Sequence, residues 1–181
     1  MQANVTRDEA MAQFASPGFG TAFRNTLYGP LRSVADFYIP FLLFRLEIQN
    51  RSQSETRIYG IDAINGSLDP YQFEDLPGAS DIVYFETRNC AKPLLDEADA
   101  KELLTSKIRK FYFATGFFRM WNFHITAEPV PGVIHIPYWV GFRGRGPRAK
   151  VFVIDAMRRT IEGAKVRHLL HDWLTSIAVN P

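Results

Sequence analysis

The chain of 181 residues contains one short pattern twice, and this repeat is the feature that most restricts its possible folds. The pattern is Ile-Pro, an aromatic residue, two or three mostly apolar residues and Phe-Arg, and it lies within residues 38–48 and 135–143. Each copy is followed by a polar turn and a second apolar stretch containing Ile-Asp-Ala, at residues 61–63 and 154–156. Two matching blocks in the same order favour a duplicated unit over chance.

Each copy is predicted to form a long β-hairpin. A proline is tolerated near the start of a strand, where it removes a hydrogen-bond donor only at the end of the ladder. Pro40 and Asp62 are 22 residues apart and Pro137 and Asp155 are 18 apart, and the difference falls in the polar turn, where insertions are tolerated. The two aspartates invite an interpretation as paired catalytic carboxylates. We favour the alternative that each one caps the turn that follows it.

Helical signals occupy the segments around the two hairpins. Thr6 and Glu9 have the spacing of a capping box, which predicts a short helix that stops by residues 16–18. Longer helices are expected from Asp96 to about Thr115 and through residues 166–177, because apolar residues recur there every three or four positions. The buried face expected for the first of these comprises Ala100, Leu103, Leu104, Ile108, Phe111 and Tyr112. A further helical piece is expected at residues 19–28.

The order of these elements predicts an α+β fold, in which antiparallel sheet built from two repeated β-hairpin units carries helices packed on one face. Extra strands are expected at residues 82–87 and 121–128, and the second should turn through the prolines of residues 129–132 into the next strand. We expect one compact domain in three parts: an N-terminal helical segment (1–34), the first hairpin unit (35–95), and a helix with the second hairpin unit and the C-terminal helix (96–181).

The second hairpin resembles a unit found in uncharacterised bacterial α+β proteins of the cystatin-like or PepSY-like kind. The resemblance rests on residues 136–139, 154–156 and 161–163, and it covers about thirty residues in each copy of the repeat. The chain departs from that pattern because it lacks the usual Thr-Gly turn after Asp155 and any zinc-ribbon cysteines. Since such modules are mostly non-catalytic, the resemblance implies a fold and argues against an enzyme, and it supplies no site.

Composition excludes several classes of protein. With 46% hydrophobic residues the chain is too apolar to be disordered, and it contains no run of about 18 apolar residues that would span a membrane. The N-terminus has no basic region followed by an apolar run, so no signal peptide is expected. A lone Cys90 forms no internal disulfide. We therefore expect a soluble, cytoplasmic protein of bacterial type.

The search for catalytic chemistry assigns no catalytic, cofactor-binding or metal-binding residue. His168 and His171 fall on the polar face of the last helix, where a solvated face is the better interpretation than a metal site. His124 and His135 are expected on neighbouring strands, where they could approach each other as a cross-strand pair. Cys90 has basic neighbours that could lower its pKa, but no family signature surrounds it. A small hydrolase or thiol enzyme using Cys90 or a histidine pair is one alternative function.

Charge is the sharpest functional signal. Residues 1–100 carry 8 Lys and Arg and 14 Asp and Glu, whereas residues 101–181 carry 13 and 5. A cluster of basic residues marks one predicted hairpin tip and comprises Arg143, Arg145, Arg148 and Lys150. This tip is either a solvated surface balanced by the acidic half or a site for an anion or an acidic partner, including a second copy in a salt-sensitive homodimer. Nucleic-acid binding is the weaker alternative, because no recognition motif accompanies the tip.

Tyr138 and Trp139 are adjacent in a predicted strand, so their side chains must face opposite sides of the sheet. One of them therefore marks a possible apolar surface unless another element covers it. Together these features predict a non-catalytic binding or protein-interaction module, with no cofactor and with an unidentified protein or anionic partner.

Overall fold

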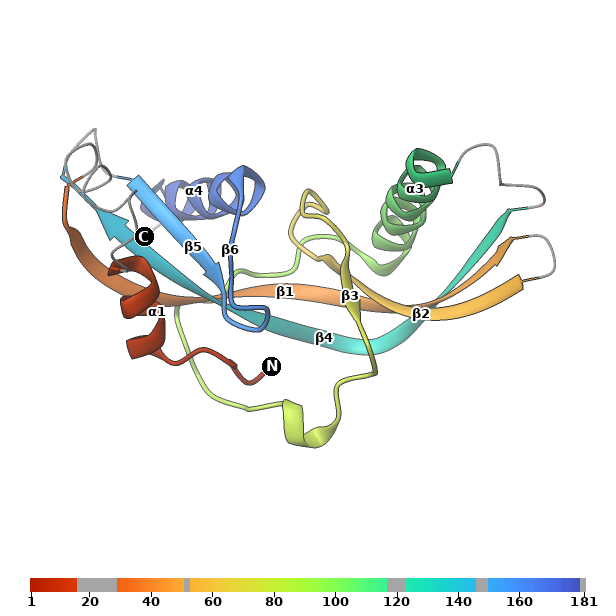
Figure 1. The fold of residues 1–181 in the computed structure, drawn as a ribbon, viewed down its shortest axis with the longest axis horizontal. Helices are drawn as coiled ribbons and strands as arrows, with labels where there is room; N and C mark the ends of the chain where they lie inside the picture. The colour runs from red at the N-terminus through yellow and green to blue at the C-terminus, as the bar shows by residue number, and fades with distance from the viewer. Residues whose placement is uncertain (16–28, 51–52, 117–122, 146–149, 180–181) are drawn as a thin grey trace. The chain divides into compact units, whose positions relative to one another are not determined.

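The computed structural model describes residues 1–15, 29–50, 53–116, 123–145 and 150–179 (Figure 1). Its elements, in chain order, are α1 (Arg7–Ala15), β1 (Leu31–Asn50), β2 (Gln53–Asp62), β3 (Tyr71–Phe73), the 3₁₀ helix η1 (Ala79–Asp81), α3 (Glu97–Gly116), β4 (His124–Arg143), β5 (Lys150–Asp155), β6 (Thr160–Ile161) and α4 (Ala164–Val179). The strands form one antiparallel sheet in the order β3-β2-β1-β4-β5-β6. The predicted α+β class is confirmed.

Contacts between residues divide the chain into two compact units, each assembled from separate segments. Unit 1 comprises Met1–Tyr38, Val83–Cys90 and Ile136–Pro181. Unit 2 comprises Ile39–Ile82 and Ala91–His135. Each unit therefore combines segments that the sequence-based division placed in different parts, and each is described by itself below.

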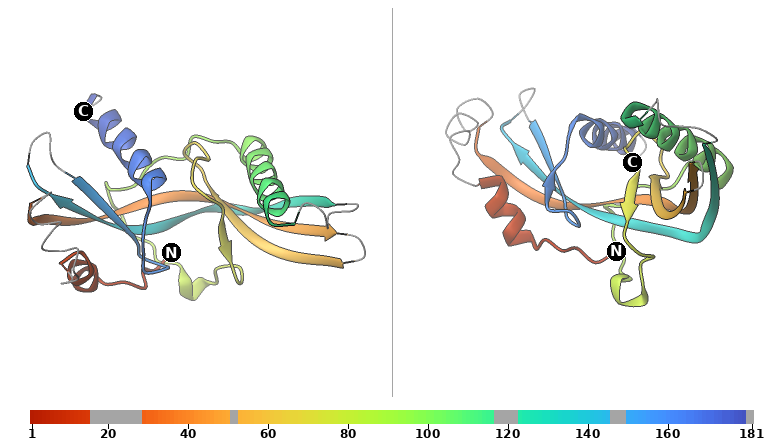
Figure 2. Two further views of the ribbon diagram at one scale, coloured as in Figure 1. Left: turned by 45° about the horizontal axis from the view of Figure 1, so that its top comes forward. Right: turned by 45° about the vertical axis from the view of Figure 1, so that its right-hand side comes forward.

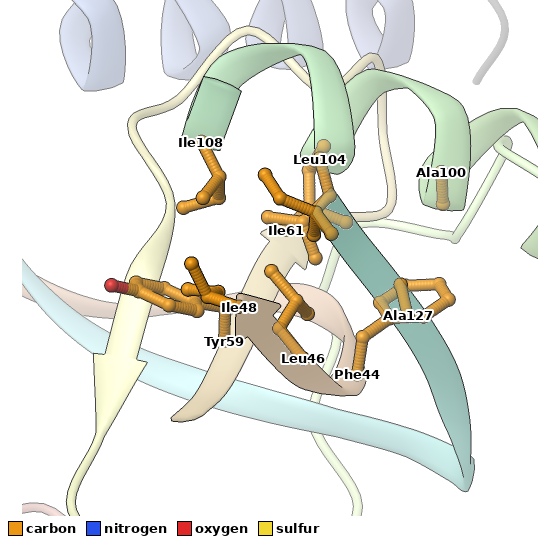
Figure 3. Packing of buried hydrophobic residues seen from close by; sticks show 10 residues of the cluster. Phe44, Leu46, Ile48, Tyr59, Ile61, Ala100, Leu104, Ile108 and Ala127 are labelled. Carbon is orange, nitrogen blue, oxygen red and sulfur yellow. The ribbon is translucent and has the colours of Figure 1, made fainter. Parts of the chain in front are cut away.

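The core of unit 2 lies between α3 and the β1–β2 hairpin (Figure 3). Alternate residues Phe44, Leu46 and Ile48 of β1 are buried, as expected for a strand with one face on a core. Ala100, Leu104 and Ile108 of α3 pack on that face. The buried stripe of α3 is narrower than the sequence predicted: Leu103 is 38% exposed and Phe111 is 61% exposed, because both lie at the flank of the helix.

In unit 1, helices lie on opposite faces of the sheet (Figures 1 and 2). Helix α1 packs on the face that carries Ile154 and Phe152, whereas Val153 between them points to the other face and is also fully buried. Helix α4 belongs to that second face, where the Trp173 ring packs at a tilt against the Phe37 ring with centroids 4.5 Å apart. The prediction placed all helices on one face of the sheet. It included the short helix that is α1, but not the face on which α1 packs.

The capping box at the start of α1 is confirmed. The Glu9 backbone N–H donates to Thr6 Oγ1 at 3.2 Å, and the Thr6 N–H donates to Glu9 Oε2 at 2.7 Å. These two bonds satisfy amides that would otherwise have no partner at the helix start. The Thr6 N–H and, to a lesser extent, the Thr6 hydroxyl donate to Glu9 Oε2 and lower the pKa of the Glu9 carboxyl.

The turns after the two Ile-Asp-Ala stretches have matching contacts. Asp62 pairs with Phe41, and Asp155 pairs with Tyr138, so each aspartate lies opposite the residue that follows a repeat proline. Both aspartates are fully buried, and each accepts backbone N–H groups from its own turn. The predicted turn-capping role is therefore confirmed. These contacts support the predicted superposition of the two hairpins, which stays a prediction.

Two details of the predicted strands differ from the structure. The expected turn at residues 129–132 is wrong, because β4 runs without a break from His124 to Arg143. Strand β5 pairs only with residues 138–143 of β4, so Pro129 and Pro131 lie outside that paired stretch, where a missing N–H is tolerated. The strand expected at residues 82–87 is irregular chain instead. The helical piece expected at residues 19–28 lies outside the described residues.

Candidate functional site

Arg143 is a structural residue of unit 1 and not part of an exposed basic tip. Its side chain is buried, with 3% exposure, and its guanidinium donates to the carbonyl oxygens of Phe14 and Gly29. Phe14 lies in the last turn of α1, where carbonyl groups lack partners within the helix. Arg143 also lies over the Phe152 ring, 5.8 Å from its centroid. The Arg143 side chain is thus buried against carbonyl groups and is not exposed as the sequence suggested, and its part in anion binding stays a prediction.

The other basic residues of the predicted tip are placed differently. Arg145 and Lys150 are exposed on either side of the turn between β4 and β5. Arg148 lies outside the described residues. The structure thus leaves two described cations at this tip, and their use as an anion or partner site stays a prediction.

Tyr138 and Trp139 do not form an exposed apolar surface. Tyr138 is 3% exposed. Trp139 packs against the cluster formed by α1 and β5, and its indole N–H donates to the Val5 carbonyl at 2.8 Å. The chain before α1 therefore covers the face on which Trp139 lies, which the sequence pattern could not show because Val5 is 134 residues away.

The surroundings of the residues considered for enzyme chemistry can be described one by one. Burial raises the pKa of the Cys90 thiol, which opposes formation of the reactive thiolate. His124 and His135 lie eleven positions apart on the same strand, β4, so they are not the cross-strand pair that was expected. His168 and His171 are exposed on α4, as predicted. Among the described residues, no group of three His, Cys, Asp or Glu side chains is placed to hold a metal ion.

One exposed feature of the described residues is an apolar loop where the sequence predicts a strand. Val83, Tyr84 and Phe85 are consecutive, and their exposed fractions are 46%, 91% and 51%. We call residues 83–85 the Tyr84 loop. Isolated exposed apolar residues are ordinary, but three in a row at the surface are typical of an interaction site. The four consecutive apolar residues that begin at Ile82 are strand-like, and they predicted a strand. Sequence alone does not show whether a neighbouring strand is available to pair with them.

The chain that follows the Tyr84 loop is fixed to β1. The Tyr38 N–H donates to the Asn89 carbonyl at 2.8 Å, and Cys90 forms a parallel bridge with Tyr38. The Asn89 side-chain amide donates to Asp36 Oδ1 at 3.0 Å. The Phe85 ring meets the Tyr38 ring edge-on, with centroids 4.9 Å apart. The loop is thus held at one end, which reduces the entropy lost when a partner binds it.

Electrostatics around the Tyr38 anchor favour its neutral form. Burial raises the pKa of the Tyr38 phenol to about 12, and the nearby Asp36 carboxylate adds to the shift. A neutral phenol can donate to the carboxylate beside it, whereas a phenolate would be repelled. Tyr38 therefore stays protonated in the folded chain to a higher pH than an ordinary tyrosine.

Acidic residues flank the Tyr84 loop. Asp81 and Glu86 lie at either end of the apolar run, and both are exposed. Unit 1 as a whole is basic, with twelve Lys and Arg and seven Asp and Glu, whereas unit 2 has nine and twelve. A partner that covers the loop would therefore need an apolar centre and basic edges.

Comparisons with known proteins give no further assignment: no family model, no curated protein and no solved structure matches this chain. Within the described ranges, none of the helices is both long and apolar enough to cross a membrane.

Proposed function

We propose that this chain is a non-catalytic binding module and that the Tyr84 loop is its contact with a protein partner. The exposure of Tyr84, 91% between two other exposed apolar residues, is the observation that carries the proposal. Aromatic residues are enriched at protein interfaces, because a large rigid ring is buried at low entropic cost. The anchor on Tyr38 presents these side chains from a fixed point of unit 1.

The alternatives have less support from the described residues. A thiol enzyme would need a lowered pKa at its cysteine, and burial shifts the pKa of Cys90 upward. An anion or nucleic-acid site at the basic tip loses Arg143 and keeps Arg145 and Lys150. The lone Cys90 is in keeping with the cytoplasmic location proposed from the sequence.

The matching turns also support the proposed kinship with cystatin-like or PepSY-like modules and the proposed duplication. In unit 2, the Ala63 N–H donates to the Pro40 carbonyl at 2.8 Å, and in unit 1 the Ala156 N–H donates to the Pro137 carbonyl at 3.0 Å. A strand that follows an Ile-Pro pair and meets an aspartate-led turn is the element on which the resemblance rests.

Site-specific photo-crosslinking tests this function. A photoreactive phenylalanine analogue replaces Tyr84 in one sample, and it replaces Glu102, an exposed residue of α3, in a matched control. In an extract of the source cells, we expect a discrete crosslinked product at position 84 only. An excess of unlabelled protein should abolish it, and an excess of the Tyr84→Ser, Phe85→Ser variant should not. Equal labelling at both positions, or equal competition by the variant, would contradict the proposal.

A further inference from the structure

We infer that Tyr84 is phosphorylated by a protein tyrosine kinase and that the phosphate releases the partner of the Tyr84 loop. This inference rests on the proposed function, because it names the regulation of the same surface. In the reaction, the Tyr84 phenol oxygen attacks the terminal phosphorus of ATP, the bond from that phosphorus to ADP breaks, and the phenol proton passes to a carboxylate of the kinase. Hydrolysis of the ester by a phosphatase restores the phenol.

The first argument is the accessibility of the acceptor oxygen. Tyr84 is 91% exposed, whereas Tyr59, Tyr71 and Tyr138 are 7%, 6% and 3% exposed. A kinase must bring the phenol oxygen into line with the phosphorus, so it requires a side chain that protrudes from the surface of its substrate. Tyr84 meets this requirement in the folded chain, and the three buried tyrosines do not.

The two remaining described tyrosines are partly buried, and each lies beside a carboxylate. The Tyr112 hydroxyl donates to Glu55, and the Tyr38 hydroxyl is hydrogen-bonded to Asp36. A phosphate on either oxygen would lose this bond and place two anions together. Among the tyrosines that the structure describes, Tyr84 is therefore the one suited to modification.

The backbone around Tyr84 also suits the groove of an enzyme. Residues 82–87 form neither helix nor strand, and Ile82 has an extended backbone with φ −108° and ψ 126°. An extended segment can lie along the groove of a second protein and offer alternate side chains to it. A kinase therefore does not have to unfold a helix or a strand to bind this segment.

Charges near Tyr84 define the kind of kinase. Asp81 lies three residues before Tyr84, Glu86 lies two residues after it, and Arg88 lies four residues after it, and all three are exposed. Asp81 is counted in unit 2 and the other two in unit 1, but the spacing along the chain is fixed by the continuous backbone. Kinases select substrates partly by such charge patterns. Because both carboxylates are closer to Tyr84 in sequence than Arg88 is, the segment fits a kinase with a basic groove.

A phosphate on Tyr84 is incompatible with the proposed contact. Phosphotyrosine carries a charge of about −1.5 to −2 at pH 7. The contact would bury the Tyr84 ring between Val83 and Phe85, and an apolar surface cannot hydrate a dianion at the end of that ring. Arg88 is the nearest cation along the chain, but Glu86 lies closer, so the segment itself does not neutralise the phosphate.

The same phosphate should leave the fold unchanged. Phe85 forms the ring contact with Tyr38, with centroids 4.9 Å apart, whereas Tyr84 is almost wholly exposed. A group added to an exposed side chain removes no packing contact. The modification thus acts on binding alone, as a local change of charge that serves as a switch.

Mass spectrometry of the protein from its source cells is the first test. Trypsin cleaves after lysine and arginine, so one peptide, residues 58–88, carries Tyr59, Tyr71 and Tyr84. The two buried tyrosines are therefore controls within the same peptide. From cells lysed with phosphatase inhibitors, we expect a fraction of this peptide to carry one phosphate, which fragmentation places on Tyr84.

The purified full chain tests the role of the charges. It is incubated with ATP, Mg²⁺ and a tyrosine kinase domain that prefers acidic substrates. The Asp81→Asn, Glu86→Gln variant should be phosphorylated at Tyr84 at least about threefold more slowly than the wild-type chain. The matched control, Glu74→Gln with Asp75→Asn, changes two exposed carboxylates farther from Tyr84 in sequence and should leave the rate unchanged.

Competition in the photo-crosslinking assay tests the release of the partner. The chain phosphorylated at Tyr84 should be at least about tenfold weaker as a competitor than the unmodified chain, and phosphatase treatment should restore it. Tyr84→Phe keeps an aromatic ring but cannot accept the phosphate. After the same kinase treatment this variant should compete as well as the unmodified chain, which excludes effects of phosphate elsewhere. Circular dichroism of the phosphorylated chain should match that of the unmodified chain.

A phosphate found on Tyr59 or Tyr71 and not on Tyr84 would overturn the inference, and so would its absence from the cellular protein under every growth condition. A phosphorylated chain that competes as well as the unmodified chain, or better, would also overturn it, because the partner would then tolerate or read the phosphate. In these cases a competed crosslink at position 84 still supports the binding module. If the unmodified chain gives no competed crosslink, the proposed function fails, and the regulation fails with it.

Discussion

Arg159 and Gly66 occupy the same turn position, four residues after Asp155 and Asp62, and both have a left-handed backbone. The φ angle is +61° at Arg159 and +66° at Gly66. Glycine adopts this conformation without strain, whereas a residue with a side chain pays about 1–2 kcal/mol for it. The surrounding contacts hold Arg159 there: its side chain donates to the Asn4 carbonyl at 2.7 Å, and Gln13 donates to its carbonyl at 3.2 Å.

Comparison of Arg159→Gly with Arg159→Ala should isolate this strain. Both changes lose the same hydrogen bond to Asn4, but only glycine relieves the left-handed backbone. We expect the glycine variant to be more stable than the alanine variant by about 1 kcal/mol, after the greater entropy of glycine in the unfolded chain is subtracted. The free energies of unfolding from urea titrations decide this, and equal values would show that the turn relaxes.

The converse change in the other turn, Gly66→Ala, should destabilise the protein by about 1–2 kcal/mol, because it introduces the same backbone strain. Its new Cβ would also lie 2.9 Å from Leu103 Cδ1, so the end of that side chain must move. An unchanged midpoint in the same titration would contradict the left-handed conformation at Gly66.

Local signals in the sequence predicted most of the regular structure. The three- and four-residue spacing around Leu169 and Leu170 placed α4, and Thr6 with Glu9 placed α1, because a helix face and a capping box depend only on neighbouring residues. The aspartate-led turns were also correct, since Asp62 and Asp155 act on amides within six residues. Features of this kind can be read without knowledge of the tertiary fold.

Features that depend on distant partners could not be predicted. Arg143 was read as part of an exposed tip because its neighbours are basic, yet its donors meet Phe14, 129 positions away. The Tyr84 loop has strand-like residues, but strand formation requires an adjacent strand, and none of the described strands pairs with it. Pro129 and Pro131 predicted a turn because proline is rare in a strand that has neighbours on both sides. Sequence does not show that β5 pairs with another part of β4.

Replacement of Asp62 by alanine should destabilise unit 2 more than any surface change. Its carboxylate accepts the N–H groups of Asn65 at 3.1 Å, Gly66 at 3.0 Å and Leu68 at 2.8 Å. Without the carboxylate, the buried N–H groups of Gly66 and Leu68 lose their acceptor. We therefore expect the free energy of unfolding to fall by about 3 kcal/mol. Asp75→Ala, at an exposed carboxylate, is the control and should change stability by less than about 0.5 kcal/mol. Chemical denaturation measures both, and similar small effects would mean that water replaces the carboxylate.

Alkaline pH should destabilise the folded chain through Tyr38. The pKa of its phenol is raised from 10.0 to about 12 in the folded state. Between these values the unfolded chain releases the proton while the folded chain keeps it, so stability falls as pH rises through this window. Tyr38→Phe lacks the titrating group and should lose stability less steeply between pH 10 and 12 than the unmodified protein. Thermal melts across that range, together with absorbance titration of the phenolates, test the assignment, and parallel curves for both proteins would contradict it.

Reactivity of Cys90 separates the binding module from the thiol-enzyme alternative. Burial raises the pKa of its thiol, so at neutral pH the folded protein holds less thiolate than free cysteine does. Cys90 is also only partly exposed, which restricts the approach of a reagent. We expect an aromatic disulfide reagent to react with Cys90 more slowly than with free cysteine at the same pH, and the rate to rise when guanidinium unfolds the chain. A folded rate above that of free cysteine would require an activating group near Cys90 and would favour the enzyme.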